Sequence, residues 1–320
     1  MYIRVVGGGS VGLLLAGKLA GADSVGVRVE IVCRTAVQAA EIARSGLSVI
    51  SLEGERRIVK PEVSSFEDEA FAEKPKPDWI LLALKQKDLD ERVLKWLSRQ
   101  VGTHTGVVGF QNGIGHEELL LSALPSTAIY LAVTTEGARR RSSVEVEHTG
   151  MGVTRIGRAL RRGSAAMPPA RRPYEEKLVQ IMQQTGFDAR WTDHIERYSW
   201  NKLVINSIVN PLTALLGIRN GALIHNAELV KLAQILLAEA GTVAESRGIQ
   251  LDEDLWEQIM NVCVRTAANH SSMLQDVSAG RRTEIDWING SLVRIAREEG
   301  IDAPTHRALY HLIKGMEAGE

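Results

Sequence analysis

The stretch Tyr2-Ile-Arg-Val-Val-Gly7-Gly8-Gly9-Ser10-Val11-Gly12 decides the fold class of this chain. Residues 2–6 are mostly apolar and predict a short strand, the glycines predict a tight turn, and residues 13–20 predict a helix. The spacing G-x-G-x-x-G is typical of dinucleotide-binding turns, in which the pyrophosphate lies on the amide groups of the helix N-terminus. A glycine-rich turn without a ligand is the alternative, but the position between a first strand and a helix favours the dinucleotide. We therefore predict that a cofactor contacts the whole run, Gly7, Gly8, Gly9, Ser10, Val11 and Gly12.

The end of the second predicted strand, residues 27–33, distinguishes two dinucleotides. An acidic residue there binds the ribose 2′-hydroxyl of NAD, whereas an Arg accommodates the 2′-phosphate of NADP. Glu30 lies inside the strand, too early for this role, and Arg34 stands where the strand ends. The sequence therefore favours NADPH or NADP+ as cofactor, with Arg34 as a ligand. The alternative is that Arg34 is a solvated residue before a helix.

Strands and helices alternate up to residue 191. Further strands are predicted at 79–84, 106–110, 128–134 and 188–191, and further helices at 37–45, 89–99 and 175–184. This alternation is typical of an α/β fold with a doubly wound parallel sheet. After a basic loop at 161–172 and one more helix and strand, the pattern becomes helical, for example at 223–245, 255–268 and 285–299. We expect an α/β domain over residues 1–193 and an all-helical domain over residues 194–320.

Length, charge and cysteine content exclude several protein classes. A chain of 320 residues is long enough for two domains. Its 38 Lys and Arg against 39 Asp and Glu leave a net charge of −1, so we expect no nucleic-acid partner and no membrane attraction. Cys33 and Cys263 are too few for a disulfide framework or a four-ligand zinc site, and no metal is expected. Glycines interrupt the apolar N-terminus and no run reaches about 20 apolar residues, so we expect a cytoplasmic protein.

Polar residues follow two of the predicted strands directly. Lys85 comes after 79–84, and Gln111-Asn112-Gly113 comes after 106–110. Loops at the carboxyl ends of parallel strands form the ligand sites of open α/β sheets, so Lys85 and Asn112 are candidate site residues. The alternatives are a solvated lysine and a simple Asn-Gly turn.

A polar stripe marks an otherwise apolar helix at 200–213. Lys202, Asn206 and Asn210 are four residues apart and share one face, while apolar residues cover the other faces. Asn is a mediocre helix former, and a buried Asn needs a partner that a polar ligand can supply. Pro211 removes a backbone donor and is expected to free a carbonyl near this site.

Two further polar runs follow in the helical half. Residues 269–276 read Asn-His-Ser-Ser-Met-Leu-Gln-Asp, and residues 283–286 read Thr-Glu-Ile-Asp. On the residues alone, Thr283 and Asp286 resemble a helix N-terminal cap, and Glu284 resembles an acid in a first helical turn. These residues by themselves assign no chemical role.

Taken in order, these motifs resemble the ketopantoate reductase family. They are the glycine turn, Lys85, Gln111-Asn112-Gly113, His148-Thr-Gly-Met-Gly-Val-Thr-Arg-Ile-Gly157, the 200–213 segment, and the runs at 271–276 and 283–286. The resemblance implies a Rossmann-type domain followed by a helical domain like the C-terminal domain of 6-phosphogluconate dehydrogenase. It also implies NADPH-dependent reduction of 2-dehydropantoate, a small 2-keto acid, to (R)-pantoate in pantothenate biosynthesis.

The resemblance also implies roles for individual residues. Lys202 would be the general acid, and Glu284 would act beside it and bind a substrate hydroxyl. Lys85 and Asn112 would touch the nicotinamide end of the cofactor. The implied substrate-binding residues are Asn112, Asn206, Asn210, Asn269, Ser272 and Glu284. These side chains suit the chemistry, because an ammonium can stabilise the oxygen that gains charge when hydride reaches a keto carbon.

One position differs from the family. Many members have His in a Thr-Thr-His-Gly-Ala segment, whereas this chain has Glu136. A reductase of another 2-keto acid is therefore an alternative, and a non-catalytic NADP(H) sensor is a second. A sensor has no need of Lys202 on one helix face with two amides, so the polar stripe favours an enzyme. The long apolar helices also predict a homodimer.

Overall fold

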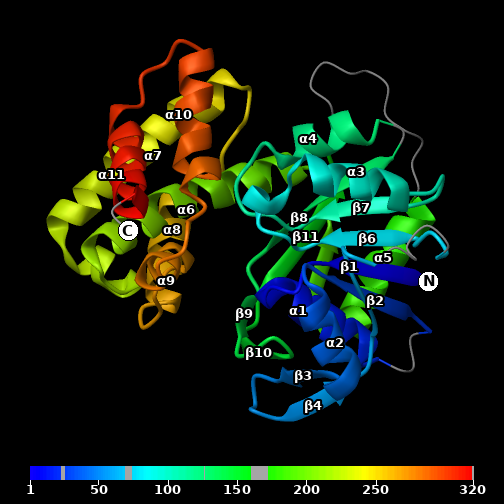
Figure 1. Ribbon diagram of the computed structural model, residues 1–320. Helices are drawn as coiled ribbons and strands as arrows, with labels where there is room; N and C mark the ends of the chain where they lie inside the picture. Colours follow the sequence, from blue (N-terminus) through cyan, green and yellow to red (C-terminus); the bar gives the residue numbers. More distant parts are fainter. Residues whose placement is uncertain (23–25, 69–73, 126, 160–171, 319–320) are drawn as a thin grey trace. The chain divides into compact units, whose positions relative to one another are not determined.

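The computed structural model describes residues 1–22, 26–68, 74–125, 127–159 and 172–318 (Figure 1). The chain forms two compact units: unit 1 contains Met1–Gln111 and His116–Ile195, and unit 2 contains Asn112–Gly115 and Glu196–Glu320. The division expected from the sequence keeps residues 1–193 together, whereas the structure assigns Asn112–Gly115 to unit 2. Ile114 explains this difference, because it is buried in the helical core and its carbonyl accepts a hydrogen bond from Ser291. Nearly all of the expected basic loop at 161–172 lies outside the described residues.

An eight-stranded sheet in the order β12-β11-β8-β7-β6-β1-β2-β5 forms the centre of unit 1 (Figure 1). Its strands are β1 (Tyr2–Val6), β2 (Arg28–Cys33), β5 (Glu62–Ser65), β6 (Trp79–Leu82), β7 (Gly106–Gly109), β8 (Ala128–Thr134), β11 (Val153–Arg158) and β12 (Asp188–Trp191). All neighbouring strands are parallel except β8 and β11, which are antiparallel. The predicted doubly wound α/β fold is confirmed, and β5 and β11 are additions that the sequence pattern did not show.

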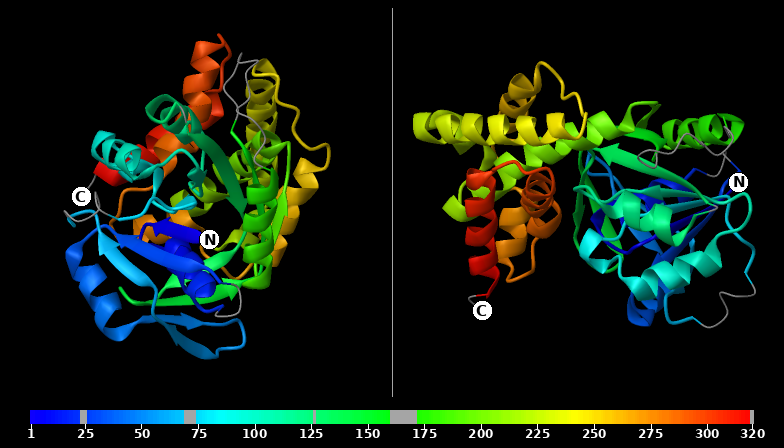
Figure 2. Two further views of the ribbon diagram at one scale, coloured as in Figure 1. Left: turned by 90° about the vertical axis from the view of Figure 1, so that its right-hand side faces the viewer. Right: turned by 90° about the horizontal axis from the view of Figure 1, so that it is seen from above.

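Helices cover both faces of this sheet, and Figure 2 shows it from two further directions. They are α1 (Ser10–Ala20), α2 (Ala36–Ser45), α3 (Glu91–Gln100), α4 (His116–Ala123) and α5 (Arg172–Gln184). Alternate side chains of a strand point to opposite faces. In β6, Trp79 and Leu81 pack in the core that includes α1, α2 and α5, whereas Ile80 and Leu82 pack with α3 and α4. This two-sided burial explains why the parallel strands read as continuous apolar runs.

A second sheet, which the sequence did not predict, also belongs to unit 1. Its order is β4 (Arg56–Val59), β3 (Leu47–Ile50), β10 (Glu145–Gly150) and β9 (Gly137–Arg140). The strands are short and carry several exposed polar residues, so their alternation is too weak to recognise in one sequence. Strands β9 and β10 contact α1, and this contact brings Arg140 to the glycine turn.

The regular elements of unit 2 are all helices among the described residues. Its α-helices are α6 (Ile195–Leu216), α7 (Ala227–Ser246), α8 (Leu255–Arg265), α9 (Ser272–Ser278), α10 (Asn289–Glu298) and α11 (Pro304–Ala318), with 3-10 helices η4 (Asn220–His225) and η5 (Ile285–Trp287). The helix expected from residue 223 begins at Ala227 instead, because Asn226 accepts hydrogen bonds from the first amides of α7 and caps it. None of the described helices is both long and apolar enough to cross a membrane.

Pro211 lies inside α6, and the carbonyl that it frees accepts a hydrogen bond from another helix. A proline at this position cannot donate to the carbonyl of Ser207. Asn289 Nδ2 of α10 donates to that oxygen at 2.9 Å and also lies 3.0 Å from His306 Nδ1. His306 Nε2 in turn donates to the Leu236 carbonyl at 2.9 Å. Pro211 thus frees a carbonyl, as expected, and a chain of hydrogen bonds through Asn289 and His306 connects this carbonyl to α10, α11 and α7.

Candidate active site

The glycine turn between β1 and α1 has space for a ligand at one position. Gly7 has a φ of 122°, and a Cβ there would lie 2.8 Å from the Ala83 oxygen. A Cβ on Gly12 would lie 1.9 Å from the Gly7 oxygen, so packing requires both glycines. A Cβ on Gly9 would meet no atom of the described chain within 4 Å. The open position is the one where a dinucleotide-binding backbone approaches pyrophosphate, so the turn fits that group.

Two side chains that the sequence did not indicate fix this turn. Gln38 Nε2 of α2 donates to the Gly8 carbonyl at 3.0 Å. Arg140 Nη1 of β9 donates to the same oxygen at 3.3 Å, and its backbone N–H donates to Ser10 Oγ at 3.1 Å. Both residues come from distant parts of the chain, so no local motif could have identified them.

Arg34 and Lys85 lie at the same edge of the sheet as the glycine turn. Strand β1 pairs in parallel with both β2 and β6, so the carboxyl ends of these three strands are neighbours. The Arg34 side chain is 70% exposed, and its Nη1 lies 3.7 Å from the Asp88 carboxylate. Lys85 follows β6 and is half-buried. The structure therefore brings the glycine turn, Arg34 and Lys85 to one edge of the sheet.

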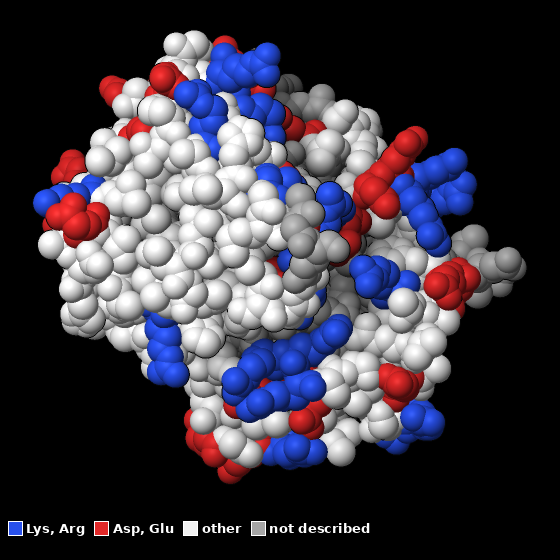
Figure 3. Space-filling view, turned by 60° about the vertical axis from the view of Figure 1, so that its left-hand side comes forward, with Lys and Arg blue, Asp and Glu red and all other residues white. Residues whose placement is uncertain are grey.

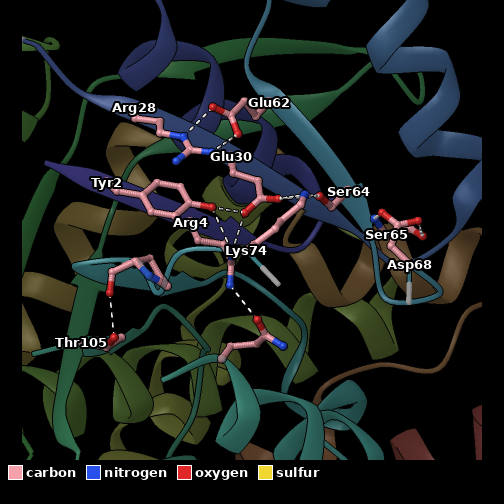
Figure 4. Close-up of polar contacts among 12 residues, drawn as sticks. Tyr2, Arg4, Arg28, Glu30, Glu62, Ser64, Ser65, Asp68, Lys74 and Thr105 are labelled. Atoms are coloured by element: carbon pink, nitrogen blue, oxygen red, sulfur yellow. Dashed lines mark hydrogen bonds and ion pairs between the residues drawn. The ribbon is translucent and has the colours of Figure 1, made fainter. Parts of the chain in front are cut away.

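Glu30 is unavailable as a ribose ligand, because it is wholly buried and fully engaged (Figure 4). It lies opposite Arg4 in the β1–β2 register, and Arg4 Nε donates to it at 2.6 Å. Lys74 Nζ donates at 2.6 Å, and the Tyr2 and Ser64 hydroxyls also donate. Burial alone would raise the pKa of Glu30, but these hydrogen bonds and Arg4 lower it to about 2. The predicted position of this acid inside the second strand is confirmed.

Lys202, Asn112 and Glu284 come together in unit 2. Lys202 Nζ donates to Asn112 Oδ1 at 2.8 Å, and Asn112 Nδ2 donates to Glu284 Oε2 at 3.2 Å. The partners define the amide orientation, because an ammonium can only donate and a carboxylate can only accept. Loss of solvent lowers the pKa of Lys202 to about 8, while the Glu284 carboxylate acts in the opposite direction. A lysine with this pKa can act as a proton donor near neutral pH.

Asn206 and Asn210 follow Lys202 along α6. Neither side-chain amide forms a hydrogen bond to a residue that the structure describes, and Asn210 is only 7% exposed. Buried amides are normally paired, so this stripe offers hydrogen bonds to a polar ligand.

The other two predicted substrate residues are on the surface of unit 2. The side chains of Asn269, in the turn after α8, and Ser272, the first residue of α9, are exposed. The neighbouring Ser271 is buried and accepts a hydrogen bond from Thr213 Oγ1 of α6 at 2.7 Å. Ser272 therefore lies toward the Asn210 end of the polar stripe. Its role in substrate binding remains a prediction.

Thr283 and Asp286 anchor the loop that carries Glu284, and they do not form the reciprocal cap that their spacing resembles. Thr283 Oγ1 donates to Glu317 of α11 at 2.7 Å. Asp286 accepts hydrogen bonds from Tyr310 at 2.9 Å and Lys314 at 3.0 Å, also in α11. Glu284 precedes η5 and bonds to Asn112, so it is not an acid of a first helical turn.

Glu136, at the position where many family members have His, pairs with His148. The Glu136 Oε2 and His148 Nε2 atoms are 2.6 Å apart, and the side chains are 4% and 6% exposed. The substitution thus creates a buried acid–imidazole pair just after β8 in unit 1.

Three further features are the possible metal ligands, the two thiols and the surface charges. Among the residues that the structure describes, no group of three or more His, Cys, Asp or Glu is arranged to hold a metal ion. Cys33 and Cys263 are buried and free, and burial raises the pKa of their thiols to about 12 and about 11. On the face shown in Figure 3, Lys and Arg side chains form small groups with Asp and Glu among them.

Comparison with known proteins matches both halves of the chain to one family. Residues 3–161 match the family model described as "Ketopantoate reductase PanE/ApbA", and residues 194–317 match "Ketopantoate reductase PanE/ApbA C terminal". The chain is 31% identical to the 2-dehydropantoate 2-reductase of Pyrococcus horikoshii, over 99% of this chain and 98% of that protein. It is 32% identical to the Bacillus subtilis protein of the same name, again over 99% and 98%.

Solved structures show the same architecture. The probable 2-dehydropantoate 2-reductase from Bacillus subtilis superposes with a TM-score of 0.81 at 31% identity and covers 99% of this chain and 100% of that one. A D-mandelate dehydrogenase solved with NADH has a TM-score of 0.86 at 23% identity, over 99% and 98%, which shows a shared fold alone. The expected family resemblance is confirmed: the chain belongs to the ketopantoate reductase family.

Proposed function

We propose that this protein is an oxidoreductase that reduces 2-dehydropantoate (ketopantoate) to (R)-pantoate with NADPH, a step of pantothenate biosynthesis. The Lys202–Asn112–Glu284 cluster carries the proposal, because it places a proton donor of suitable pKa on a stripe of free amides. The full-length likeness to proteins named 2-dehydropantoate 2-reductase supports the choice of substrate.

The cofactor would be held by unit 1. The amides that follow Gly9 would receive the pyrophosphate, Arg34 the 2′-phosphate, and Lys85 the nicotinamide side, to which Asn112 would also contribute. When bound, a reduced nicotinamide supplies the hydride that the 2-keto carbon of the substrate accepts. Gln38 and Arg140 hold the turn in place through the Gly8 carbonyl.

Lys202 would supply the proton of the reaction. Its ammonium donates a hydrogen bond to the keto oxygen, stabilises the negative charge that develops there, and transfers a proton to form the hydroxyl. Asn112 accepts a hydrogen bond from Lys202 and thereby restricts its direction. Glu284 raises the lysine pKa and is available as an acceptor for a substrate hydroxyl. Asn206, Asn210, Asn269 and Ser272 would complete the substrate contacts.

The test is NADPH oxidation with ketopantoate beside a panel of other 2-keto acids. We expect ketopantoate to give the largest kcat/KM. A larger kcat/KM for another 2-keto acid would show that the protein is a reductase of that acid. Binding of NADPH without turnover of any keto acid would instead favour the sensor. The homodimer expected from the apolar helices remains a separate prediction, which sedimentation equilibrium would test.

A further inference from the structure

An acid, Asp88, lies beside Arg34, the residue predicted to bind the group that distinguishes NADP from NAD. Arg34 stands at the end of β2, the position that meets the 2′ substituent of the adenine ribose in this fold. Asp88 Oδ1 lies 3.7 Å from Arg34 Nη1, and the Asp88 side chain is 29% exposed. Any group that Arg34 binds at this distance therefore also lies near a carboxylate.

Asp88 is held in this place by its own segment. It ends η3 (Gln86–Asp88), which follows Lys85 directly, and its backbone N–H donates to the Lys85 carbonyl at 2.9 Å. The next residue, Leu89, is 5% exposed and packs in the core beneath the α3 and α4 face. The carboxylate thus belongs to an anchored turn at the cofactor edge of the sheet.

The other polar side chains at the end of β2 are buried or form hydrogen bonds within the protein. Glu30 is wholly buried among its four donors, and Cys33 is buried. Thr35 Oγ1 accepts the Gln38 N–H and caps α2. Arg34 and Asp88 are therefore the opposed pair that the structure offers to a 2′ substituent.

Asp88 is expected to disfavour the 2′-phosphate of NADPH and to favour the 2′-hydroxyl of NADH. A phosphate monoester carries a charge of about −1.5 to −2 near neutral pH, so it is attracted by Arg34 and repelled by Asp88. A ribose hydroxyl is neutral and can donate a hydrogen bond to the carboxylate, as the acidic residue of NAD-binding proteins accepts one. Asp88 also neutralises part of the Arg34 charge when no phosphate is bound.

We propose that Asp88 is a specificity-determining residue that limits the preference for NADPH over NADH created by Arg34. This inference rests on the proposed nicotinamide-dependent function. It predicts that the protein binds both cofactors with a modest preference, and that the preference grows when the carboxylate is removed.

The test is the equilibrium dissociation constant of NADPH and of NADH for Asp88→Asn, measured by fluorescence of the bound nicotinamide. We expect the ratio of the NADH to the NADPH constant to rise about five-fold, as expected for one partly exposed charge interaction. The effect should shrink at high salt, because exposed charges are screened. Asp88→Ser provides a second variant if the amide makes new contacts of its own.

Glu91→Gln is the matched control, since it removes one exposed negative charge three residues along the chain. Its cofactor ratio should equal that of the unaltered protein. An unchanged ratio in both Asp88 variants, while Arg34→Ala alters it, would overturn the inference and leave the proposed function intact. Failure of both cofactors to bind the unaltered protein would instead overturn the proposed function.

Discussion

Each unit contains a cluster in which a carboxylate lies close to a lysine. The two clusters differ in how deeply the carboxylate is buried and in how many hydrogen bonds it accepts. In unit 1, Glu30 is wholly buried and accepts hydrogen bonds from four side chains, Arg4 and Lys74 among them. In unit 2, Lys202 and Glu284 are half-buried, and Asn112 bridges them.

The number of hydrogen-bond partners decides whether a buried charge stabilises the fold or can take part in proton transfer. Four donors lower the pKa of Glu30 to about 2, so its charge does not change near neutral pH. Loss of solvent instead brings the pKa of Lys202 down to about 8, within reach of neutral pH. A buried charge with a full set of hydrogen-bond partners stabilises the fold. A desolvated group whose pKa lies near neutral pH can instead transfer a proton.

The largest expected effect is on the reaction, from Lys202→Met. This change keeps the length of the side chain and removes the proton donor, so kcat should fall about a thousand-fold, within the usual range for loss of a general acid. The measurement is steady-state NADPH oxidation with ketopantoate, together with NADPH binding, which should remain. Lys231→Met is the control, because Lys231 is an exposed lysine of the same unit that pairs with Glu228. Unimpaired turnover by Lys202→Met would remove the lysine from the mechanism.

The next largest effect is on stability, from Glu30→Gln. The variant leaves Arg4 and Lys74 without the buried carboxylate, which should cost about 3 kcal/mol in the free energy of unfolding. The folded pKa of Glu30, about 2, lies below its ordinary value of 4.5. The carboxylate's contribution is therefore complete above about pH 4.5 and is lost as the pH falls through about 2. Urea unfolding at neutral and acidic pH should show the difference from the unaltered protein shrink with acid.

The exposed pair Arg28–Glu62 supplies the matched control for Glu30. It joins β2, the strand of Glu30, to β5 with a distance of 2.6 Å, but its side chains are 44% and 46% exposed (Figure 4). Glu62→Gln should change stability by less than about 1 kcal/mol, since solvent screens such pairs. If Glu30→Gln and Glu62→Gln lowered the free energy of unfolding equally, the burial of Glu30 and its four hydrogen bonds would give it no special role in stability.

The sequence predicted the larger elements of the fold because their burial is periodic. β8 and β12 occupy the predicted ranges, and α6 covers the whole polar stripe. The second sheet escaped prediction because its short strands pair across long sequence separations, as β3 does with β10. Such pairing leaves little trace in a local pattern.

The candidate site was predictable in its parts but not in its contacts. The glycine turn has a local motif, and Lys202 stood out because a cation and two amides shared an apolar helix. Glu284 had no local signal beyond a resemblance to an acid in a first helical turn, and its hydrogen bond to Asn112 joins residues that are 172 positions apart. No sequence pattern pointed to Asp88, because its proposed role depends on the nearby side chain of Arg34, which follows another strand.

A smaller effect concerns the pH dependence of the second cluster. Because Lys202 must be protonated to act as an acid, kcat/KM for reduction should fall about tenfold per pH unit above about pH 8. Lys202→Arg retains a positive charge that does not titrate in this range, so its residual activity should lose this alkaline limb. A limb that persists unchanged in Lys202→Arg would belong to another group.

The smallest expected effect comes from Glu284→Gln, which tests the coupling within the cluster. The Glu284 carboxylate raises the pKa of Lys202, so its removal should move the alkaline limb of kcat/KM to lower pH. The amide can still contact Asn112, so the variant changes charge more than shape. A loss of kcat/KM at every pH without a shifted limb would mean that Glu284 only binds substrate. Glu228→Gln is the control, because Glu228 is an exposed acid of the same unit that pairs with Lys231, and its limb should stay in place.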